Sequence, residues 1–252
     1  MAVFALTDAE ILAGPLRLTG RSNQLEVAAE ATELNVTTFG SGGWEELIMG
    51  QRKWMASTSG FYDASPLETG GLNFDEEVLA QRTGGAQYPL TFCPFQADGG
   101  VAYVGGFRRG QLSIGGTVGD AFPMSSAMAG DGVLGRGALI HPASTTRTGN
   151  GTGNAVVLGT VATGQRLLVA IHVLTVSGTT PALTLTVQRD DGAGFASPTT
   201  VVTTGSLSAP TSSLTVVDGP ITPDDRYRVI WTLTGTSPVA RFAVAVATTN
   251  TI

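Results

Sequence analysis

Side chains that carry out catalysis are scarce in this chain. Its 252 residues include one cysteine, Cys93, one lysine, Lys53, and two histidines, His141 and His172. Enzymes draw their nucleophiles and general bases mainly from Cys, Lys, His and activated Ser or carboxylates. No Ser/His/Asp or Cys/His set stands at catalytic spacing. We therefore expect a protein that is not an enzyme and that holds no cofactor.

Metal and phosphate sites lack their sequence motifs as well. His141 and His172 have no second His, Cys or carboxylate at ligand spacing, so we expect no metal site. The glycine run at 132–137, GVLGRG, lacks the Gly-Lys-Ser/Thr ending of a phosphate loop, and no helical pattern follows it. The pairs Asp190-Asp191 and Asp224-Asp225 fall at expected turns, where Asp bonds locally. We interpret them as solvated turns rather than a glycosidase or calcium site.

Charge is low and unevenly distributed. Charged residues make up 13% of the chain, against about 25% in an average globular protein. The net charge of −6 argues against non-specific binding of nucleic acid, which requires Lys and Arg. Residues 1–147 carry 15 acidic and 9 basic side chains, giving −6, whereas residues 148–252 carry five of each, giving zero. A surface with little charge favours self-association, and the split indicates two regions in different surroundings.

The N-terminal stretch and the cysteine count bear on the protein's compartment. The first 18 residues, MAVFALTDAEILAGPLRL, have no basic n-region and carry Asp8 and Glu10 within the apolar stretch. We expect neither a signal peptide nor a membrane span there. One cysteine excludes an internal disulfide, and Cys93, flanked by aromatic residues, is expected to be a buried inert thiol.

A break in composition divides the chain. Residues 142–154, PASTTRTGNGTGN, form a Pro, Ser, Thr, Gly and Asn segment typical of an exposed linker. This segment coincides with the charge boundary. We therefore predict one domain over residues 1–141, a linker over 142–154 and a second domain over 155–252.

The first region is predicted to be mostly β with one short helix. Residues 24–39 combine the alternation of a strand with Ala and Glu content that favours a helix, and we favour a long strand or hairpin. A Ser-Gly-Gly loop and a strand at 53–59 follow. Asn73 stands at the cap position and Glu76 at the third position of a capping box, which predicts a helix over 74–83.

The second region is predicted to be an antiparallel β-sandwich. Apolar residues alternate through 183–187, 227–233 and 240–246, and 167–176 is an apolar run of strand length. We expect the segment Gly235-Thr-Ser-Pro238 to join the last two strands as a hairpin, and the similar Gly178-Thr-Thr-Pro181 to be another turn. His172, inside an apolar strand, is expected to be hydrogen-bonded or to face outward.

An ordered set of motifs in the first region resembles the tail tube (major tail) proteins of long-tailed bacteriophages. The resemblance covers roughly residues 15–145 and rests on motif order together with the one intervening helix. The motifs are Lys53-Trp54, STSGFYD at 57–63, Pro94-Phe95, GGVAY at 99–103, GTVGD at 116–120 and Gly135-Arg-Gly137. The stretches 169–181 and 230–238 look like the β-sandwich modules appended to many phage structural proteins.

The resemblance implies a fold, a location and partners. It implies a tail-tube-like β-barrel or sandwich with a flanking helix, assembled in the host cytoplasm into stacked, hexameric rings of the virion tail. The partners would be other copies, the tape measure, tail terminator and distal tail proteins, and viral DNA that passes through the lumen without specific binding. No membrane is implied.

Particular residues follow from this interpretation. A lumen that repels phosphate would let DNA slide, so acidic residues of the first region are candidates to face it. The candidates are Glu26, Glu30, Glu33, Glu45, Glu46 and Asp63. The Gly-rich loop with an aromatic residue, Ser41, Gly42, Gly43 and Trp44, is the candidate assembly contact.

Two other classes of function stay open on the sequence. One is a virion decoration or host-surface protein whose second region binds glycan, although Tyr227 and Trp231 are expected to face the core, which leaves Phe195 as the exposed aromatic. The other is an esterase or glycosidase on a β scaffold, for which no side-chain set is visible.

Overall fold

The computed structural model describes residues 8–62, 71–72 and 85–250, and these form an almost entirely β fold, as predicted. Within these ranges, one 3-10 turn, η1, spans Phe39–Ser41. The strands are β1 Glu10–Ala13, β2 Leu16–Arg17, β3 Ser22–Asn35, β4 Leu47–Phe61, β5 Tyr88–Cys93, β6 Val101–Ile114, β7 Pro123–His141, β8 Gly151–Thr152, β9 Val156–Val157, β10 Gln165–Asp190, β11 Thr199–Thr203, β12 Thr211–Asp218 and β13 Arg226–Asn250.

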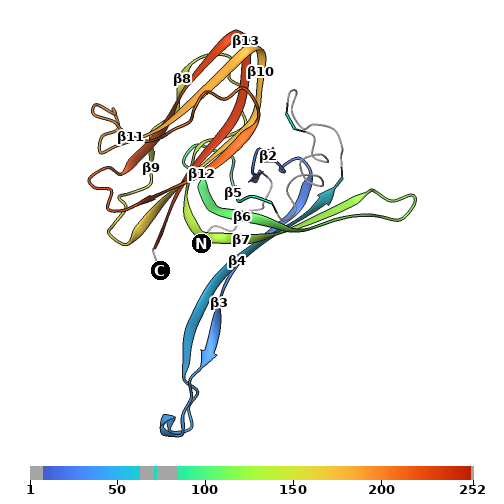
Figure 1. Ribbon diagram of the computed structural model, residues 1–252, viewed down its shortest axis with the longest axis vertical. Coiled ribbons are helices and arrows are strands. Elements are labelled where there is room, and N and C mark those ends of the chain that lie inside the picture. The colour runs from blue at the N-terminus through green and yellow to red at the C-terminus, as the bar shows by residue number, and fades with distance from the viewer. Residues whose placement is uncertain (1–7, 63–70, 73–84, 251–252) are drawn as a thin grey trace.

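All of the described strands belong to one branched, antiparallel sheet (Figure 1). Its main path runs β11-β10-β13-β7-β6-β5-β1-β2, and β12 pairs with β10. A branch leaves β7, where β4 pairs with β7 and β3 pairs with β4. Two long hairpins, β3–β4 and β6–β7, project from the body in different directions (Figure 1).

The branch has a physical cause in a tryptophan that packs on glycines. β7 pairs with β4 through Pro123–Ala129 and with β13 through Arg136–His141. Between these stretches Trp54 covers Gly130, where an added Cβ would lie 2.4 Å from the indole ring, and donates a hydrogen bond from Nε1 to the Gly132 carbonyl oxygen at 3.1 Å. The indole therefore fills the space where the two partners of β7 diverge.

β10 and β13 form one long antiparallel ribbon that folds over on itself. Gln165 faces Asn250 at one end, and Asp190 faces Arg226 at the other. Apolar residues of both halves, such as Val169 and Leu185, belong to one buried cluster. The two halves of the ribbon therefore enclose the core of the C-terminal part.

The predicted hairpin at residues 235–238 is wrong, and so is the predicted turn at 178–181. The two segments lie opposite each other within the ribbon, with Thr179 facing Thr236, and both strands continue through them. Gly178 and Gly235 have φ of 123° and 120°. A Cβ on Gly178 would lie 2.9 Å from the Ser237 carbonyl oxygen, so close backbone contact requires glycine there. The repeated Gly-Thr-Thr/Ser-Pro pattern is thus a paired bend.

Polar contacts join the C-terminal ribbon to the N-terminal strands, and we call this boundary the seam. His172 of β10 is fully buried, with Nδ1 2.7 Å from the Gly14 carbonyl oxygen and Nε2 2.8 Å from Thr91 Oγ1. Because a carbonyl only accepts, Nδ1 carries the proton and Nε2 accepts from the threonine. Burial lowers the pKa of His172 to about 4, so the ring is neutral.

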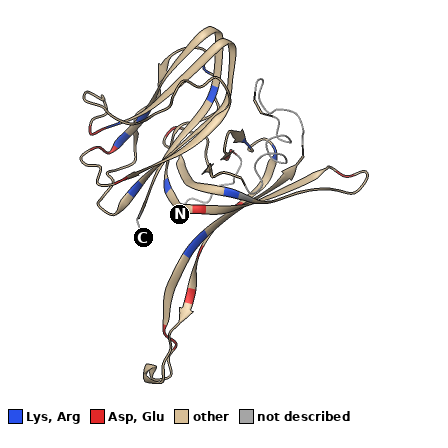
Figure 2. Cartoon of the chain, in the orientation of Figure 1, with Lys and Arg blue, Asp and Glu red and all other residues tan. Residues whose placement is uncertain are grey.

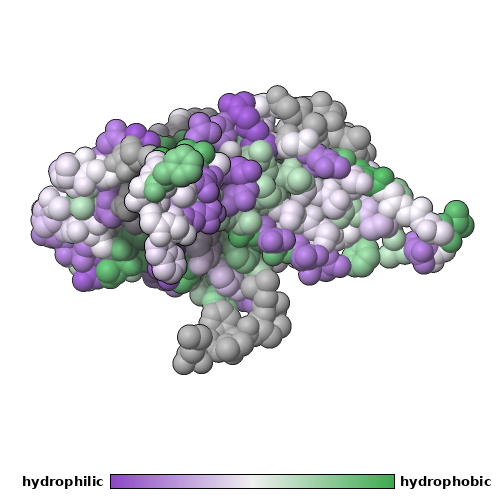
Figure 3. All heavy atoms as spheres, turned by 90° about the horizontal axis from the view of Figure 1, so that it is seen from below, coloured by the Kyte–Doolittle hydropathy of each residue, from purple (hydrophilic) through white to green (hydrophobic). Residues whose placement is uncertain are grey.

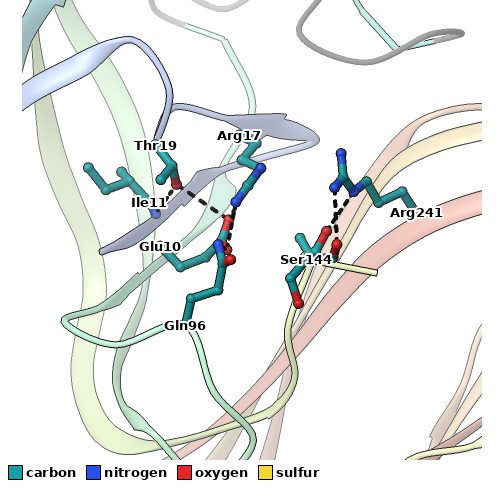
Figure 4. A network of polar contacts seen from close by, with 8 residues as sticks. Glu10, Ile11, Arg17, Thr19, Gln96, Ser144 and Arg241 are labelled. Atoms are coloured by element: carbon teal, nitrogen blue, oxygen red, sulfur yellow. Dashed lines mark hydrogen bonds and ion pairs between the residues drawn. The ribbon is translucent and has the colours of Figure 1, made fainter. Parts of the chain in front are cut away.

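A second polar cluster lies close to this seam (Figure 4). Glu10 is fully buried and accepts from Arg17 Nε at 2.6 Å, and Thr19 and Gln96 also donate to it. Burial raises the pKa of Glu10, against the opposing effect of the arginine. Arg241 of β13 donates to the carbonyl oxygens of Ala143 and Ser144 beside it.

Three further expectations concern Cys93, residues 142–154 and residues 74–83. Cys93 is buried and burial raises the pKa of its thiol, as an inert thiol requires. Within residues 142–154, Arg147 exchanges backbone hydrogen bonds with Ala240 at 2.8 Å, and β8 pairs with β13. This segment therefore lies along β13, and the two-domain division stays a prediction. The predicted helix over 74–83 lies outside the described residues.

Candidate assembly surfaces

Four strands make up an antiparallel sheet, in the order β3-β4-β7-β6, with one buried and one exposed face. Along β4, Trp54, Ala56 and Thr58 are buried, while Lys53, Met55 and Ser57 alternate with them on the exposed face. This alternation is the period of two that a half-buried strand requires. The buried face packs in one cluster with Ile11, Leu18, Leu90 and Phe107.

The exposed face of these four strands carries small and polar side chains, and we call it the polar face. Cross-strand partners place Gln24 beside Ser59 and Ser59 beside Ser125, and Glu26 beside Ser57 and Ser57 beside Ala127. The polar face consists of Gln24, Glu26, Ala28, Glu30, Lys53, Met55, Ser57, Ser59, Arg108, Gln111, Ser113, Ser125, Ala127 and Ala129.

Most charges on the polar face are compensated. Lys53 Nζ lies 3.0 Å from Glu30 Oε1, and Arg108 Nε lies 2.7 Å from Asp131 Oδ2 at the edge of the face. Among the side chains that the structure describes there, Glu26 is the carboxylate without an ionic partner. Figure 2 shows both acidic and basic residues along the β3–β4 hairpin. The polar face is therefore nearly neutral, with one uncompensated negative charge.

Both outer edges of the four-stranded sheet lack a neighbouring described strand over part or all of their length. Among the described strands, β3 pairs with β4 alone. β6 pairs with β5 through Tyr103–Phe107, so its Arg108–Ile114 stretch faces no described strand on that side. Because neighbouring strands alternate in direction, the two open edges, β3 and β6, run antiparallel to each other. Open edges expose unpaired backbone groups that readily add another strand.

Residues 31–52 form the free part of the β3–β4 hairpin, which we call the arm. At its end, residues 39–44 include η1, then Gly42 and Gly43 with φ of 64° and 88°, and then Trp44. Phe39 and Trp44 are fully or largely exposed, and we call these two residues the arm tip. The remaining exposed large apolar residues of the arm are Leu34, Val36, Leu47, Ile48 and Met49.

The arm is apolar on both of its faces. Leu34 faces Ile48 across the hairpin, whereas Leu47 and Met49 point to the other side because successive side chains alternate. Each is about half exposed. A hairpin that rested on one surface would need only one apolar face, so this arm is suited to insertion between two surfaces.

The opposite end of the same sheet carries a second apolar group. Phe61 faces Pro123, and the β6–β7 hairpin turns beyond this point through Val118 and Phe122. Phe61, Val118 and Phe122 are 51%, 103% and 47% exposed, and we call them the end patch. The phenylalanine at 122 also packs edge-on against Tyr62, with ring centroids 5.4 Å apart. Figure 3 shows the hydrophobic end of this hairpin at its right edge.

The predicted site residues fall into separate groups. Glu26 and Glu30 lie on the polar face, Glu33 lies on the arm, and Glu45 and Glu46 are exposed near the arm tip. Asp63 lies outside the described residues. Ser41, Gly42, Gly43 and Trp44 lie together at the end of the arm. The lumen role of the acidic residues and the assembly role of the loop stay predictions.

Sequence reasoning missed the aliphatic part of the arm and the end patch. A signal for the arm was present in Leu47-Ile48-Met49, three consecutive large apolar residues, because a half-buried strand would alternate them with polar ones. The end patch gave no such signal, since Phe61, Val118 and Phe122 are brought together only by strand pairing.

The described residues contain no group of three or more His, Cys, Asp or Glu side chains arranged to hold a metal ion. No described helix is long and apolar enough to cross a membrane.

Comparison with known proteins gives distant structural likenesses. A chain from the virion of a native gene transfer agent particle is 21% identical, with a TM-score of 0.40 over 52% of this chain and 96% of that one. A chain of the SPP1 tail tube is 12% identical, with a TM-score of 0.42 over 54% and 80%. The SPP1 Dit protein, described as a paradigm of the hub adsorption apparatus in phages that infect Gram-positive hosts, is 11% identical, with a TM-score of 0.33 over 96% and 100%. No protein-family model and no curated protein sequence matches the chain.

Proposed function

We propose that this protein is the structural subunit of a phage tail tube, assembling into rings that stack around a channel for DNA. The observation that carries the proposal is the four-stranded sheet, which has two open, mutually antiparallel edges and one polar exposed face. Such a sheet is a repeating unit whose two edges fit one another.

Antiparallel pairing between successive copies follows from the strand count. When β3 of one copy adds to β6 of the next, the new pair is antiparallel, because the unit contributes an even number of alternating strands. The contact joins two different edges, so it is heterologous, and such contacts make closed rings when the rotation per copy closes. The resemblance stated above implies six copies per ring.

In this proposal the polar face lines the channel. Its serine, alanine and glutamine side chains offer little charge for DNA phosphates to bind, and Lys53 and Arg108 are held by carboxylates. Glu26 then supplies one uncompensated negative charge per copy, repeated around the ring. DNA would pass without specific binding because the lining offers no free cation among its described side chains.

The rest of the chain is assigned on the same basis. Residues 1–141 would supply the ring and residues 155–252 would stand outside it, with the seam through His172 and β13 fixing their orientation. Other copies, the tail proteins that start and end the tube, and DNA would be the partners. The protein would act in the virion tail after assembly in the host cytoplasm.

The test is the assembly state of the purified, full-length chain. We expect sedimentation and negative-stain electron microscopy to show rings or tubes with a central channel at high protein concentration. Lysine at two positions along the β6 edge, in the double variant Gln111→Lys and Ser113→Lys, should prevent rings while leaving the thermal unfolding midpoint within a few degrees. A chain that stays monomeric at every concentration would contradict the proposal.

A further inference from the structure

Two uncovered apolar groups lie at opposite ends of one sheet. Strand β4 begins in the arm at Leu47, which pairs with Asn35. It ends in the end patch at Phe61, which pairs with Pro123. The arm tip therefore projects from one end of the strands and the end patch from the other. Neither group is covered by the described residues of its own chain.

The geometry points to the end patch as the receptor for the arm of a second copy of this chain. We propose that the arm tip of a copy in one ring packs against Phe61, Val118 and Phe122 of a copy in the adjacent ring. This inference rests on the proposed tail tube function and adds the surface on which one ring recognises the next.

The symmetry of this contact favours open-ended stacking. The donor group and the receptor group differ and lie at opposite ends of the unit, so one contact leaves a free donor at one end and a free receptor at the other. A heterologous contact of this kind continues without limit along its direction. Contact between two like ends would stop after one pair. Stacked rings require the open-ended arrangement.

The apolar area of the arm tip fits a specific contact. An aromatic side chain buries about 150–250 Å² when it is covered, and the arm tip supplies two of them, Phe39 and Trp44, at 111% and 81% exposure. Together they would bury about 300–500 Å², close to half of the ~800 Å² that each partner contributes to a stable interface. The end patch offers two half-exposed phenylalanine rings, and aromatic pairs favour each other beyond the area they bury.

The two phenylalanines of the end patch are held in place by neighbouring residues. Phe122 is fixed by its edge-on contact with Tyr62, and the Tyr62 amide donates to the Phe122 carbonyl oxygen at 2.9 Å. Phe61 is held by the β4–β7 pairing and donates from its amide to the Arg21 carbonyl oxygen at 3.0 Å. A preformed surface loses little conformational entropy when a partner binds.

Crosslinking tests the contact directly. In the full-length chain, Glu46→Cys places a thiol beside the arm tip and Asp120→Cys places one beside the end patch, and both positions are exposed. The native Cys93 is fully buried and does not compete. With a short bis-maleimide, assembled double-cysteine protein should give a ladder of covalent multimers, and each single-cysteine protein should give none. Assembled protein without a ladder would overturn the inference.

Substitution separates this inference from the proposed function. In Phe61→Ser with Phe122→Ser, we expect single rings to form, while the protein concentration needed for tubes rises at least ~10-fold, a loss of about 1.4 kcal/mol per contact. The matched control is Val157→Ser with Val216→Ser, which removes two side chains of similar exposure in the C-terminal part and should leave tubes unchanged. Tubes of normal length from the phenylalanine variant would overturn the inference while leaving ring formation intact. If the wild-type chain forms no rings, that result would instead overturn the proposed function.

Discussion

Nε2 of His172 lies 2.8 Å from Thr91 Oγ1, so a buried hydrogen bond joins the C-terminal ribbon to β5 of the N-terminal part. The other ring nitrogen is bonded to the Gly14 carbonyl oxygen at 2.7 Å. The neutral ring satisfies both partners, whereas a charged ring could not accept the hydrogen bond from Thr91. The two hydrogen bonds that His172 makes to the N-terminal part therefore require a neutral ring.

The pH dependence of stability should report this histidine. The unfolded chain binds a proton near pH 6.5, whereas the pKa of folded His172 is about 4. Stability is therefore fully present above pH 6.5 and falls as the pH drops toward 4, by up to roughly 3 kcal/mol for this one group. Urea unfolding at pH 7.5, 5.5 and 4.5 measures the fall.

The control for this prediction is His172→Gln, which keeps polar groups but does not titrate. Its loss of stability over the same range should be smaller than that of the wild type. His141, whose pKa is also lowered to about 4 by burial, remains in both proteins and cancels in the comparison. Equal losses in the two proteins would show that His172 does not contribute.

The packing of Trp54 on Gly130 predicts a dependence between two positions. In Gly130→Ala the new Cβ would overlap the indole ring, so we expect a loss of about 1–3 kcal/mol from overpacking. In the background of Trp54→Leu, the same Gly130→Ala change should cost much less. A double-mutant cycle by urea unfolding measures the coupling. Gly149→Ala, where the added Cβ meets nothing within 4 Å, is the matched control. Additive effects at positions 54 and 130 would be evidence against the contact.

The buried Glu10–Arg17 pair predicts a large effect from one substitution. Arg17→Met leaves the fully buried Glu10 carboxylate without its charged partner, and breaking such a pair typically costs about 3–5 kcal/mol. Arg166→Met removes an exposed pair with Asp218 and should cost less than ~1 kcal/mol. Chemical unfolding of both variants makes the comparison. Similar small losses would mean that the buried pair is not formed.

Charge on the polar face should control the speed of DNA passage. Glu26→Lys with Glu30→Lys would add free cations to the channel lining, so DNA ejection from particles built with this variant should slow several-fold, with normal tubes. The slowing should lessen at high salt, because phosphate contacts weaken as salt rises. Asp218→Lys, on an exposed strand of the C-terminal part, is the control. DNA ejection at the wild-type rate from particles built with the Glu26→Lys and Glu30→Lys double variant would refute a lumen position for these two residues.

The sequence predicted fold class better than connectivity. Alternating residues such as Val169, Leu185 and Val229 predict strands because burial of one face has a period of two. The paired bend at Gly178 and Gly235 was not predictable, because a Gly-Thr-Ser-Pro segment that ends a strand and one that bends it have the same local composition. Only the long-range pairing of Thr179 with Thr236 distinguishes the two.

The candidate surfaces were predictable only in part. A Gly-rich loop ending in Trp44 indicates an exposed aromatic residue from local sequence alone. The net charge of residues 1–147 is a sum over the whole segment. It does not reveal that Lys53 neutralises Glu30 or that Glu26 has no ionic partner among the described side chains of the polar face. The polar face and the end patch arise from the register between strands that are distant in sequence, which single-sequence patterns do not determine.

The most direct measurement is a cryo-electron microscopy cross-section of the tube assembled from the full-length chain. We expect a closed β wall in which β3 of one copy pairs antiparallel with the Arg108–Ile114 stretch of β6 in the next. We also expect Glu26, Ser57 and Ser125 to point into the channel. A channel lined by other residues, or an assembly in which the β3 and β6 edges remain unpaired, would contradict this expectation.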